Sequence, residues 1–440
     1  MSLTATAHLI RLILRRDRLR ISIWIAAIAL LVFFTAVGVK SLFPTQASID
    51  QAAAATEHNA GAIAFNGPAQ GLDTLGGQIA FQVGAFGMIA VALMSFFMIG
   101  RLTRGDEEAG RLELVRSLPV GIHAPAFAAL ITVVGMNVAV GVLSSAALLA
   151  EGLPAVGSLA LGASYTVVGV FFTGAALLAA QVTENTRVVY GSSGALLGLA
   201  YLMRIVGDIG DGRLSWFSPI GLAQKARPYA GERWWPLLLL FVPAAVLIAV
   251  ASRLAVRRDY GSGLVAPRPG RTDAAPSLGH PLGLAMRLQR GSLIGWGAGV
   301  LVTGIAYGWI APTIDSFVAG NKALAQMMAS AGSGSLTDTY FATAFRVLAL
   351  IASGFAIQSA LRLRGEESAL RAESVLATPV SRWRWGSSHL VIALAGSVGL
   401  LAVAGLATGI SYGLAGGPWS SVPRLLGAAL VYAPAIWLMT

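Results

Sequence analysis

The sequence is poor in charge and contains no cysteine. Only 12% of its 440 residues are charged, and the lack of cysteine excludes disulfides, thiolate zinc sites and cysteine nucleophiles. It also lacks the G-x-x-x-x-G-K-[ST] loop that binds nucleotide phosphates. The five histidines are scattered, with no HExxH motif and no evident nucleophile-base pair. We therefore expect no catalytic residue, no metal site and no enzymatic activity on this chain.

Long apolar runs take the place of charge. The chain is 56% hydrophobic and its mean hydropathy is +0.72, values typical of a protein with many membrane spans. A helix needs about 20 apolar residues to cross the bilayer. Runs of that length predict an all-α polytopic membrane protein with nine full spans, and a tenth that begins near Leu425. The nine lie at residues 21–39, 79–100, 126–150, 159–181, 188–206, 235–252, 293–311, 340–361 and 387–410.

Basic residues indicate which ends of the spans face the cytoplasm. With the N-terminus inside, the inner segments hold 22 of the 31 Lys and Arg residues, as the positive-inside rule requires. The outer loop at 207–234 deviates, because it carries four basic residues, although three acids offset most of them. We expect a multi-pass protein of a bacterial cytoplasmic membrane with its N-terminus in the cytoplasm. Basicity spread over loops in this way does not indicate a nucleic-acid partner.

A basic amphipathic segment precedes the first span. Its apolar side chains share one helical face and its arginines another, which predicts a helix lying in the membrane interface; a merely solvated basic tail is the alternative. The two faces consist of Leu9, Leu12 and Ile13, and of Arg11, Arg15 and Arg18.

Two charged stretches repeat each other without a gap. Residues 104–120 (RGDEEAGRLELVRSLPV) and 364–380 (RGEESALRAESVLATPV) match at an offset of 260, and His8, Arg15, Arg18 and Trp24 match residues 272 positions later. Both stretches follow the second span of their half, which predicts parallel repeats. We expect a six-span repeat at 1–258, a cytoplasmic linker at 259–279 and a truncated repeat of about four spans at 280–440. The native product is then expected to continue for about 80 to 100 residues, enough for two more spans.

Each charged stretch is predicted to form a short cytoplasmic helix. Arg104 with Glu108, and Glu107 with Arg111, have the i to i+4 spacing of helical ion pairs, and Pro119 would end the helix. A single stretch of this kind is most simply a solvated, salt-paired helix. Its duplication in register favours a docking surface used twice. The residues are Arg104, Glu107, Glu108, Arg111, Leu112 and Glu113, and in the second copy Arg364, Glu366, Glu367, Arg371 and Glu373.

The stretch EEAGRLELVRSLPV at 107–120 resembles the coupling segment of type-2 ABC exporter permeases; in the second copy Leu370 replaces its glycine. The segment at 214–238, LSWFSPIGLAQKARPYAGERWWPLL, is similar to the outer segment of fused twelve-span permeases described as exporters of polyketide antibiotics and other drugs. Within it we single out Trp216, Pro219, Lys225 and Arg227.

This resemblance implies a permease subunit for multidrug efflux and antibiotic resistance. Its elbow helices would lie in the interface before each half, and two copies of a cytoplasmic ABC ATPase would dock near 104–118 and 364–378. ATP and Mg would be bound by that partner and no cofactor by this chain. The cargo would be small amphipathic molecules exported through the bilayer.

Two other classes of function remain open. Parallel six-span repeats also describe gradient-driven carriers, which need a carboxylate or histidine inside the membrane. We find no Asp, Glu or His in the interior of the nine full spans, which favours a separate ATPase. A non-transporting membrane sensor or scaffold is the other alternative.

A few side chains within the spans are candidates for the transport path. Arg346 is placed about two turns into the eighth span, where charge is costly, and Phe86 is its counterpart in the first half. Met88, Met94 and Phe97 offer deformable apolar surface, although lipid-facing residues have the same composition. Arg204 is expected to snorkel to the outer headgroups. Small-residue spacing at Gly194 and Gly198, and at Gly405, Gly409 and Gly413, predicts close helix packing.

Overall fold

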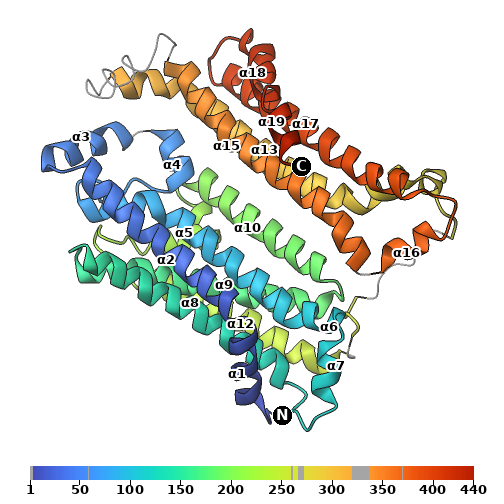
Figure 1. Cartoon of the computed structure of the whole chain (residues 1–440). Coiled ribbons are helices and arrows are strands. Elements are labelled where there is room, and N and C mark those ends of the chain that lie inside the picture. The colour runs from blue at the N-terminus through green and yellow to red at the C-terminus, as the bar shows by residue number, and fades with distance from the viewer. Residues whose placement is uncertain (1–2, 58, 259–260, 266–271, 320–335, 369) are drawn as a thin grey trace. The chain divides into compact units, whose positions relative to one another are not determined.

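The computed structural model describes residues 3–57, 59–258, 261–265, 272–319, 336–368 and 370–440. Over these ranges the chain is helical and contains no strand (Figure 1). Ten helices are long and apolar enough to cross a membrane, and they coincide with the nine predicted spans and the tenth, so the all-α polytopic fold is confirmed. The chain divides into unit 1, Met1–Arg268, and unit 2, Pro269–Thr440.

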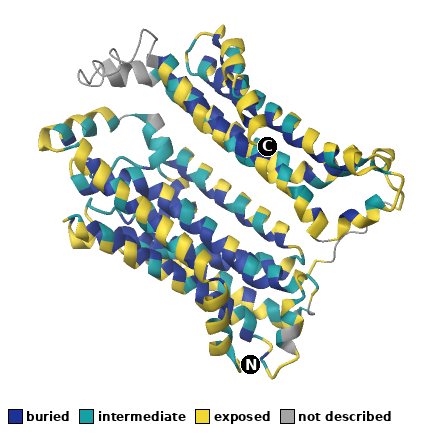
Figure 2. Cartoon of the chain, in the orientation of Figure 1, coloured by how far each residue is buried: buried dark blue, intermediate teal, exposed yellow. Residues whose placement is uncertain are grey.

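Unit 1 is built around one central helix. α9 packs against α5, α8, α10 and α12, and Figure 2 shows buried residues concentrated on α5, α8 and α9. The six long helices are α2 (Arg18–Leu42), α5 (Leu75–Gly100), α8 (Ala124–Ala150), α9 (Ala155–Val182), α10 (Thr186–Ile209) and α12 (Trp235–Arg257).

Small residues bring these helices together. A Cβ placed on Gly141 of α8 would stand 2.6 Å from the carbonyl oxygen of Gly162 on α9. Lipid tails solvate apolar side chains as well as protein does, so close backbone approach and dense packing stabilise the bundle more than burial itself. Glycines at such contacts therefore determine which helices are neighbours.

Short elements close the two ends of unit 1 (Figure 1). The end with the N-terminus carries α1 (Thr6–Arg16), the π-turn η1 (Arg101–Gly105), α6 (Asp106–Glu108) and α7 (Arg111–Arg116). The opposite, predicted outer end carries α3 (Gln46–Thr56), α4 (Ala60–Asn66), η2 (Leu214–Phe217) and α11 (Pro219–Gln224).

Unit 2 contains four candidate spans. They are α13 (Pro281–Ala319), α15 (Leu336–Ser368), α17 (Arg382–Leu414), and α18 (Ser421–Leu430) with α19 (Ala433–Leu438). The short elements are η3 (Pro276–Gly279) and α16 (Arg371–Leu376), the latter at the end of α15 away from α18 (Figure 1).

The helix that precedes the first span differs between the units. In unit 1, α1 ends at Arg16 and α2 begins at Arg18, with Asp17 between them. In unit 2, α13 runs unbroken from Pro281 through the span. The expectation of a separate elbow helix is therefore met in unit 1 and wrong in unit 2, where Gln289 occupies the position of Asp17 at the offset of 272.

The predicted glycine contacts are confirmed in one helix and wrong in the other. A Cβ on Gly405 or Gly409 would stand within 2.9 Å of α18 backbone atoms, so these glycines let α17 and α18 touch. Gly194 and Gly198 of α10 have no atom within 4 Å of that position. Their spacing serves no helix contact within the described part of unit 1.

Candidate coupling sites and transport path

The charged stretch of unit 1 is a bent strap and not a single helix. α5 passes through the π-turn η1 into α6, the backbone turns at Gly110 with a φ of 68°, and α7 follows. A φ of this sign suits glycine because it has no Cβ. The expected continuous helix from Arg104 to Pro119 is therefore wrong, since the chain leaves helical geometry between Glu108 and Arg111.

The break changes every predicted ion pair in this strap. Glu107 binds Arg104 at 2.6 Å and Arg258 at 2.6 Å, and not Arg111. Arg111 instead binds Asp106 at 2.6 Å. Glu108 does not meet Arg104 but accepts a hydrogen bond from the backbone N–H of Thr186, at 2.6 Å. The i to i+4 rule fails for Glu107 and Arg111 because the helix is broken between them, and for Arg104 and Glu108 because Arg104 lies in the wider π-turn η1.

Asp17 and Asp106 tie the strap to the interfacial helix. Arg16 bridges the two, at 2.7 Å from Asp17 and 2.9 Å from Asp106. Asp17 is 2% exposed and also binds Arg101 at 2.9 Å and Arg20 at 3.1 Å. Neither aspartate was recognised as a candidate, because each pairs with residues far away in the sequence.

Burial acts to raise the pKa of Asp17, but hydrogen bonds and charges from Arg16 and Arg101 outweigh it, so this pKa lies below its ordinary value. Burial likewise acts to lower the pKa of Arg16, and its hydrogen bonds to Asp106 and Asp17 outweigh it, so the pKa of Arg16 lies above its ordinary value. Both groups remain charged around neutral pH.

Unit 2 repeats the geometry of the strap at the same offset of 260. Leu370 has a φ of 57° where Gly110 has 68°, and α16 matches α7 residue for residue. Arg371 binds Glu366 at 2.7 Å, as Arg111 binds Asp106, and this hydrogen bond raises the pKa of Arg371. The turn therefore comes from the repeated pattern as a whole and not from glycine alone.

The two straps differ in how firmly they are held. Arg104 is buried, and besides Glu107 it donates to the carbonyl oxygens of Ala180 at 2.5 Å and Ser262 at 3.0 Å. Arg364 and Glu367, the counterparts of Arg104 and Glu107, are exposed. Both straps expose further side chains: Arg111 and Glu113 in unit 1, with Leu112 half-buried, and Arg371 and Glu373 in unit 2.

The outer segment of unit 1 is a plug inserted among the spans. Pro219 is the first residue of α11 and is buried. Trp216 stacks on Trp235 with ring centroids 5.3 Å apart, and the Lys225 ammonium lies 4.5 Å from the Trp216 ring centroid. Arg227 has a φ of 51° and lines a small cavity beside α5.

Tyr229 locks this plug in place. A Cβ on Gly76 or Gly157 would stand 2.5 Å or 2.2 Å from its ring, so the ring fits between α5 and α9 only because both positions are glycine. Its hydroxyl is 2.8 Å from the Ser158 hydroxyl. Burial raises the pKa of Tyr229 to about 12, so the phenol is neutral at physiological pH.

The expectation that Arg204 snorkels is wrong. Its side chain is buried and donates to the carbonyl oxygens of Ile63, Ala64 and Phe65, at 3.1, 2.5 and 3.2 Å. The oxygens of Ala64 and Phe65 belong to the last turn of α4, where carbonyl groups lack helical partners, and that of Ile63 also accepts from the backbone N–H of Gly67. Arg204 thus caps α4 and fastens the outer loop to α10.

Two polar clusters inside the bundles escaped prediction. In unit 1 the buried Asn137 accepts from Ser95 at 2.9 Å and donates to Thr173 at 3.1 Å, joining α5, α8 and α9. In unit 2 Gln289 contacts His389, at 3.1 Å, and Ser359. His389 is two turns inside α17 and 2% exposed, and it is the third residue of the predicted span 387–410.

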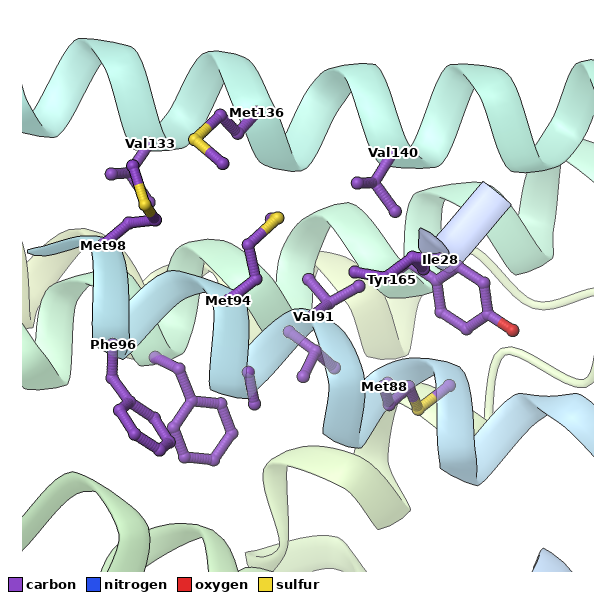
Figure 3. Close-up of a cluster of buried hydrophobic side chains, with 14 of the residues drawn as sticks. Ile28, Met88, Val91, Met94, Phe96, Met98, Val133, Met136, Val140 and Tyr165 are labelled. Atoms are coloured by element: carbon purple, nitrogen blue, oxygen red, sulfur yellow. The ribbon is translucent and has the colours of Figure 1, made fainter. Parts of the chain in front are cut away.

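The candidate path residues separate into two groups. Met88 and Met94 are buried in the core of unit 1, and Figure 3 shows Met94 directed toward Met136 of α8. Both take part in helix packing, and Met88 also lines the small cavity beside α5 that Arg227 lines. Phe86 is exposed on α5, and so is Phe97, which stacks on Trp24 and meets Tyr190 edge to face. Arg346 is exposed on α15.

Comparison with known proteins places the chain in a family. A family model described as the C-terminal domain of the multidrug efflux system permease Rv1217c matches residues 278–440. The chain is 39% identical over 441 aligned residues to the multidrug efflux system permease protein Rv1217c of Mycobacterium tuberculosis, and the alignment covers 99% of this chain and 80% of that protein. The chain therefore belongs to the family of the permease Rv1217c.

Proposed function

We propose that this chain is the membrane permease subunit of an ATP-driven exporter of amphipathic drugs or antibiotics. Two copies of a separate ABC ATPase, which binds ATP and Mg, dock on the straps at 104–118 and 364–378. The observation that carries this proposal is the same bent strap, with the same acid–arginine pair, after the second span of each unit. The name of the relative in Mycobacterium tuberculosis supports efflux as the activity.

The ion pairs give docking a mechanical consequence. Force applied to α7 passes through Arg111 and Asp106 to Arg16, and from there through Asp17 to Arg101 at the end of α5. Asp17 and Asp106 are buried, and separating a buried carboxylate from its partners is costly, so we expect α1, α2 and α5 to move with the strap. The Arg111–Asp106 pair, in which Arg111 is half exposed, is the weakest contact of this series. Closure of the ATPase pair would then tilt these helices between inward-open and outward-open arrangements.

Docking is tested best with the exposed acids. Glu113→Lys and Glu373→Lys reverse charge at the two straps, whereas Glu107 holds two arginines and its replacement would disturb folding. Glu57→Lys, on the exposed end of α3 at the opposite end of unit 1, is the matched control. We expect the ATPase to co-purify with wild type and Glu57→Lys, and its recovery to fall at least about tenfold with the double reversal, because like charges oppose docking. Equal recovery from all three would contradict the proposal.

A gradient-driven carrier is the second candidate, and the buried His389 is the observation that favours it, since such a site can hold a coupling proton. Proteoliposomes separate the two functions. Export that requires ATP and the ATPase, and that a pH gradient without ATP does not drive, supports the first. Export by the purified chain with a pH gradient alone, lost in His389→Gln, would establish the carrier.

A further inference from the structure

Unit 2 contains an apolar groove between two of its spans. The groove has a volume of about 390 Å³ and runs between α13 and α17. Leu282, Met286 and Leu293 line one wall, and Val391 and Leu400 belong to the other. The lining residues run from Leu282 to Gly297 on α13 and from Val391 to Val403 on α17, so the groove extends from the beginning of α13 to the middle of α17.

Two glycines open the groove. Gly297 and Gly399 line it, and at the repeat offsets of 272 and 260 their counterparts in unit 1 are Ile25 and Ala139. Gly396 also lines the groove, but a Cβ there would stand 2.5 Å from the Phe355 ring, so this glycine lets α17 pack on α15. A Cβ on Gly399 would meet no atom within 4 Å, and one on Gly297 would meet only Leu400, at 3.8 Å. The space beside these two glycines is therefore not required for α13 and α17 to pack.

The straight course of α13 leaves the groove uncovered. In unit 1, α1 bends away from α2 at Asp17 and packs on α8, and Ile10 is partly buried against the core. In α13, Leu282, the counterpart of Ile10, is 46% exposed, and Met286 is 44% exposed, much as its counterpart Leu14 is in unit 1. Within unit 2 the groove is thus open from the side.

Positive charge surrounds the beginning of the groove. Arg290 follows Met286 by four residues and precedes Leu293 by three, so it shares their face of α13. Arg384 precedes Val391 by seven residues on α17, and Arg287 is on the same turn of α13 as Arg290. All three are exposed, and none has an ion-pair partner among the described residues. Neither Pro281–Pro312 nor Arg382–Leu414 contains an acid.

We propose that this groove holds an acyl chain of an anionic phospholipid whose headgroup contacts these arginines. An apolar groove alone would not retain a lipid, because a chain is equally well solvated by its neighbours in the bilayer. Selectivity therefore comes from the headgroup. Each arginine near an anionic surface contributes enough to favour anionic lipid about fivefold. The inference depends on the geometry of unit 2 and not on the proposed ATPase.

Native mass spectrometry of the full chain, released from nanodiscs of equal phosphatidylglycerol and phosphatidylcholine, tests the site. We expect wild type to retain phosphatidylglycerol at least about fivefold over phosphatidylcholine. Gly297→Ile and Gly399→Leu fill the groove and should abolish retention. Gly295→Ile, on the opposite side of α13 with no atom within 4 Å, should not. Arg290→Gln and Arg384→Gln should each lower the lipid preference about fivefold.

Two outcomes would overturn the proposal. If Gly297→Ile and Gly399→Leu both retain as much phosphatidylglycerol as wild type, the lipid binds at another place on the protein. Equal retention of the two lipids by wild type would remove the headgroup role and leave a groove open to any apolar molecule, a transported drug included. A thermal unfolding transition shows whether each variant is folded. If Gly297→Ile does not fold, Gly399→Leu alone provides the test.

Discussion

Units 1 and 2 begin from the same repeated pattern and hold it in different ways. In unit 1, Asp17 interrupts the first helix and gathers Arg16, Arg20 and Arg101 around one carboxylate. In unit 2, Gln289 stands at that position, the helix continues, and the amide contacts His389 and Ser359 instead. One acid-to-amide difference thus coincides with a separate interfacial helix in one unit and an open groove in the other.

The two straps have the same backbone turn but differ in the contacts that hold them to the spans. The left-handed residue and the acid–arginine pair recur at an offset of 260. Unit 1 adds carbonyl groups of Ala180 and Ser262 and the guanidinium of Arg258 around it. The turn therefore depends on residues within each strap, whereas the rigidity of the strap depends on contacts with residues distant in the sequence.

The largest difference in unfolding free energy between the two units is expected for substitutions of Glu107 and its counterpart Glu367. Glu107→Gln leaves Arg104, which is 1% exposed, and Arg258 without their carboxylate, and breaking a buried pair in this way costs about 3–5 kcal/mol. Glu367→Gln alters an exposed side chain and should cost within about 0.5 kcal/mol. Unfolding of the chain in mixed micelles measures both free energies. Similar values for the two variants would show that unit 1 is not the firmer one.

Asp17→Asn is expected to cost about 1.5–3 kcal/mol at neutral pH, because it removes charged hydrogen bonds from a buried carboxylate. The folded-state pKa of Asp17 lies below the ordinary value of 3.8, so its stabilisation is present above that pH and disappears as the pH falls through the folded pKa. The difference between wild type and Asp17→Asn should therefore vanish in strong acid. A difference that does not decrease as the pH falls would contradict the ionic role.

Exchanging the left-handed residues should give opposite signs in the two units. Gly110→Leu introduces a Cβ at a positive φ and should destabilise by about 1 kcal/mol. Leu370→Gly relieves the same strain, and since Leu370 is mostly exposed it should stabilise by up to about 1 kcal/mol. Thermal unfolding midpoints compare the pair. Destabilisation by both changes would mean that Leu370 makes contacts that outweigh its backbone strain.

The smallest changes in unfolding free energy are expected at Arg111 and Arg371, and the two changes should be equal. Each pairs with a buried acid but keeps about half of its own side chain exposed, 48% and 59%, so Arg111→Gln and Arg371→Gln should each cost no more than about 1 kcal/mol. Added salt should reduce both costs alike. Unfolding at low and high ionic strength provides the measurement, and a clear inequality would show that the two pairs are not equivalent.

The spans could be predicted from the sequence because membrane insertion depends on local composition. A run of apolar residues satisfies its backbone only as a helix in the bilayer, whatever its neighbours are, and all nine predicted runs and the tenth are candidate spans. The repeat of the straps was visible for the same reason, since its register is preserved in the chain itself.

The partners of individual charges could not be predicted in this way. Arg204 meets the end of α4 about 140 residues earlier in the chain, and Glu107 meets Arg258 about 150 residues later. Asn137 and His389 are single polar residues in apolar runs, and only packing determines whether they face lipid or a neighbouring helix. Each of these contacts depends on which helices are adjacent.

The sequence by itself determined the membrane environment, the number of candidate spans and the duplicated charged turn, because hydrophobic length and local periodicity act over a few consecutive residues. Only the tertiary structure decided which unit holds its strap rigidly, where the interfacial helix breaks and where glycines leave a groove. The reason is that a buried charge or a missing side chain has a consequence only through the atoms packed around it, and those come from distant parts of the chain.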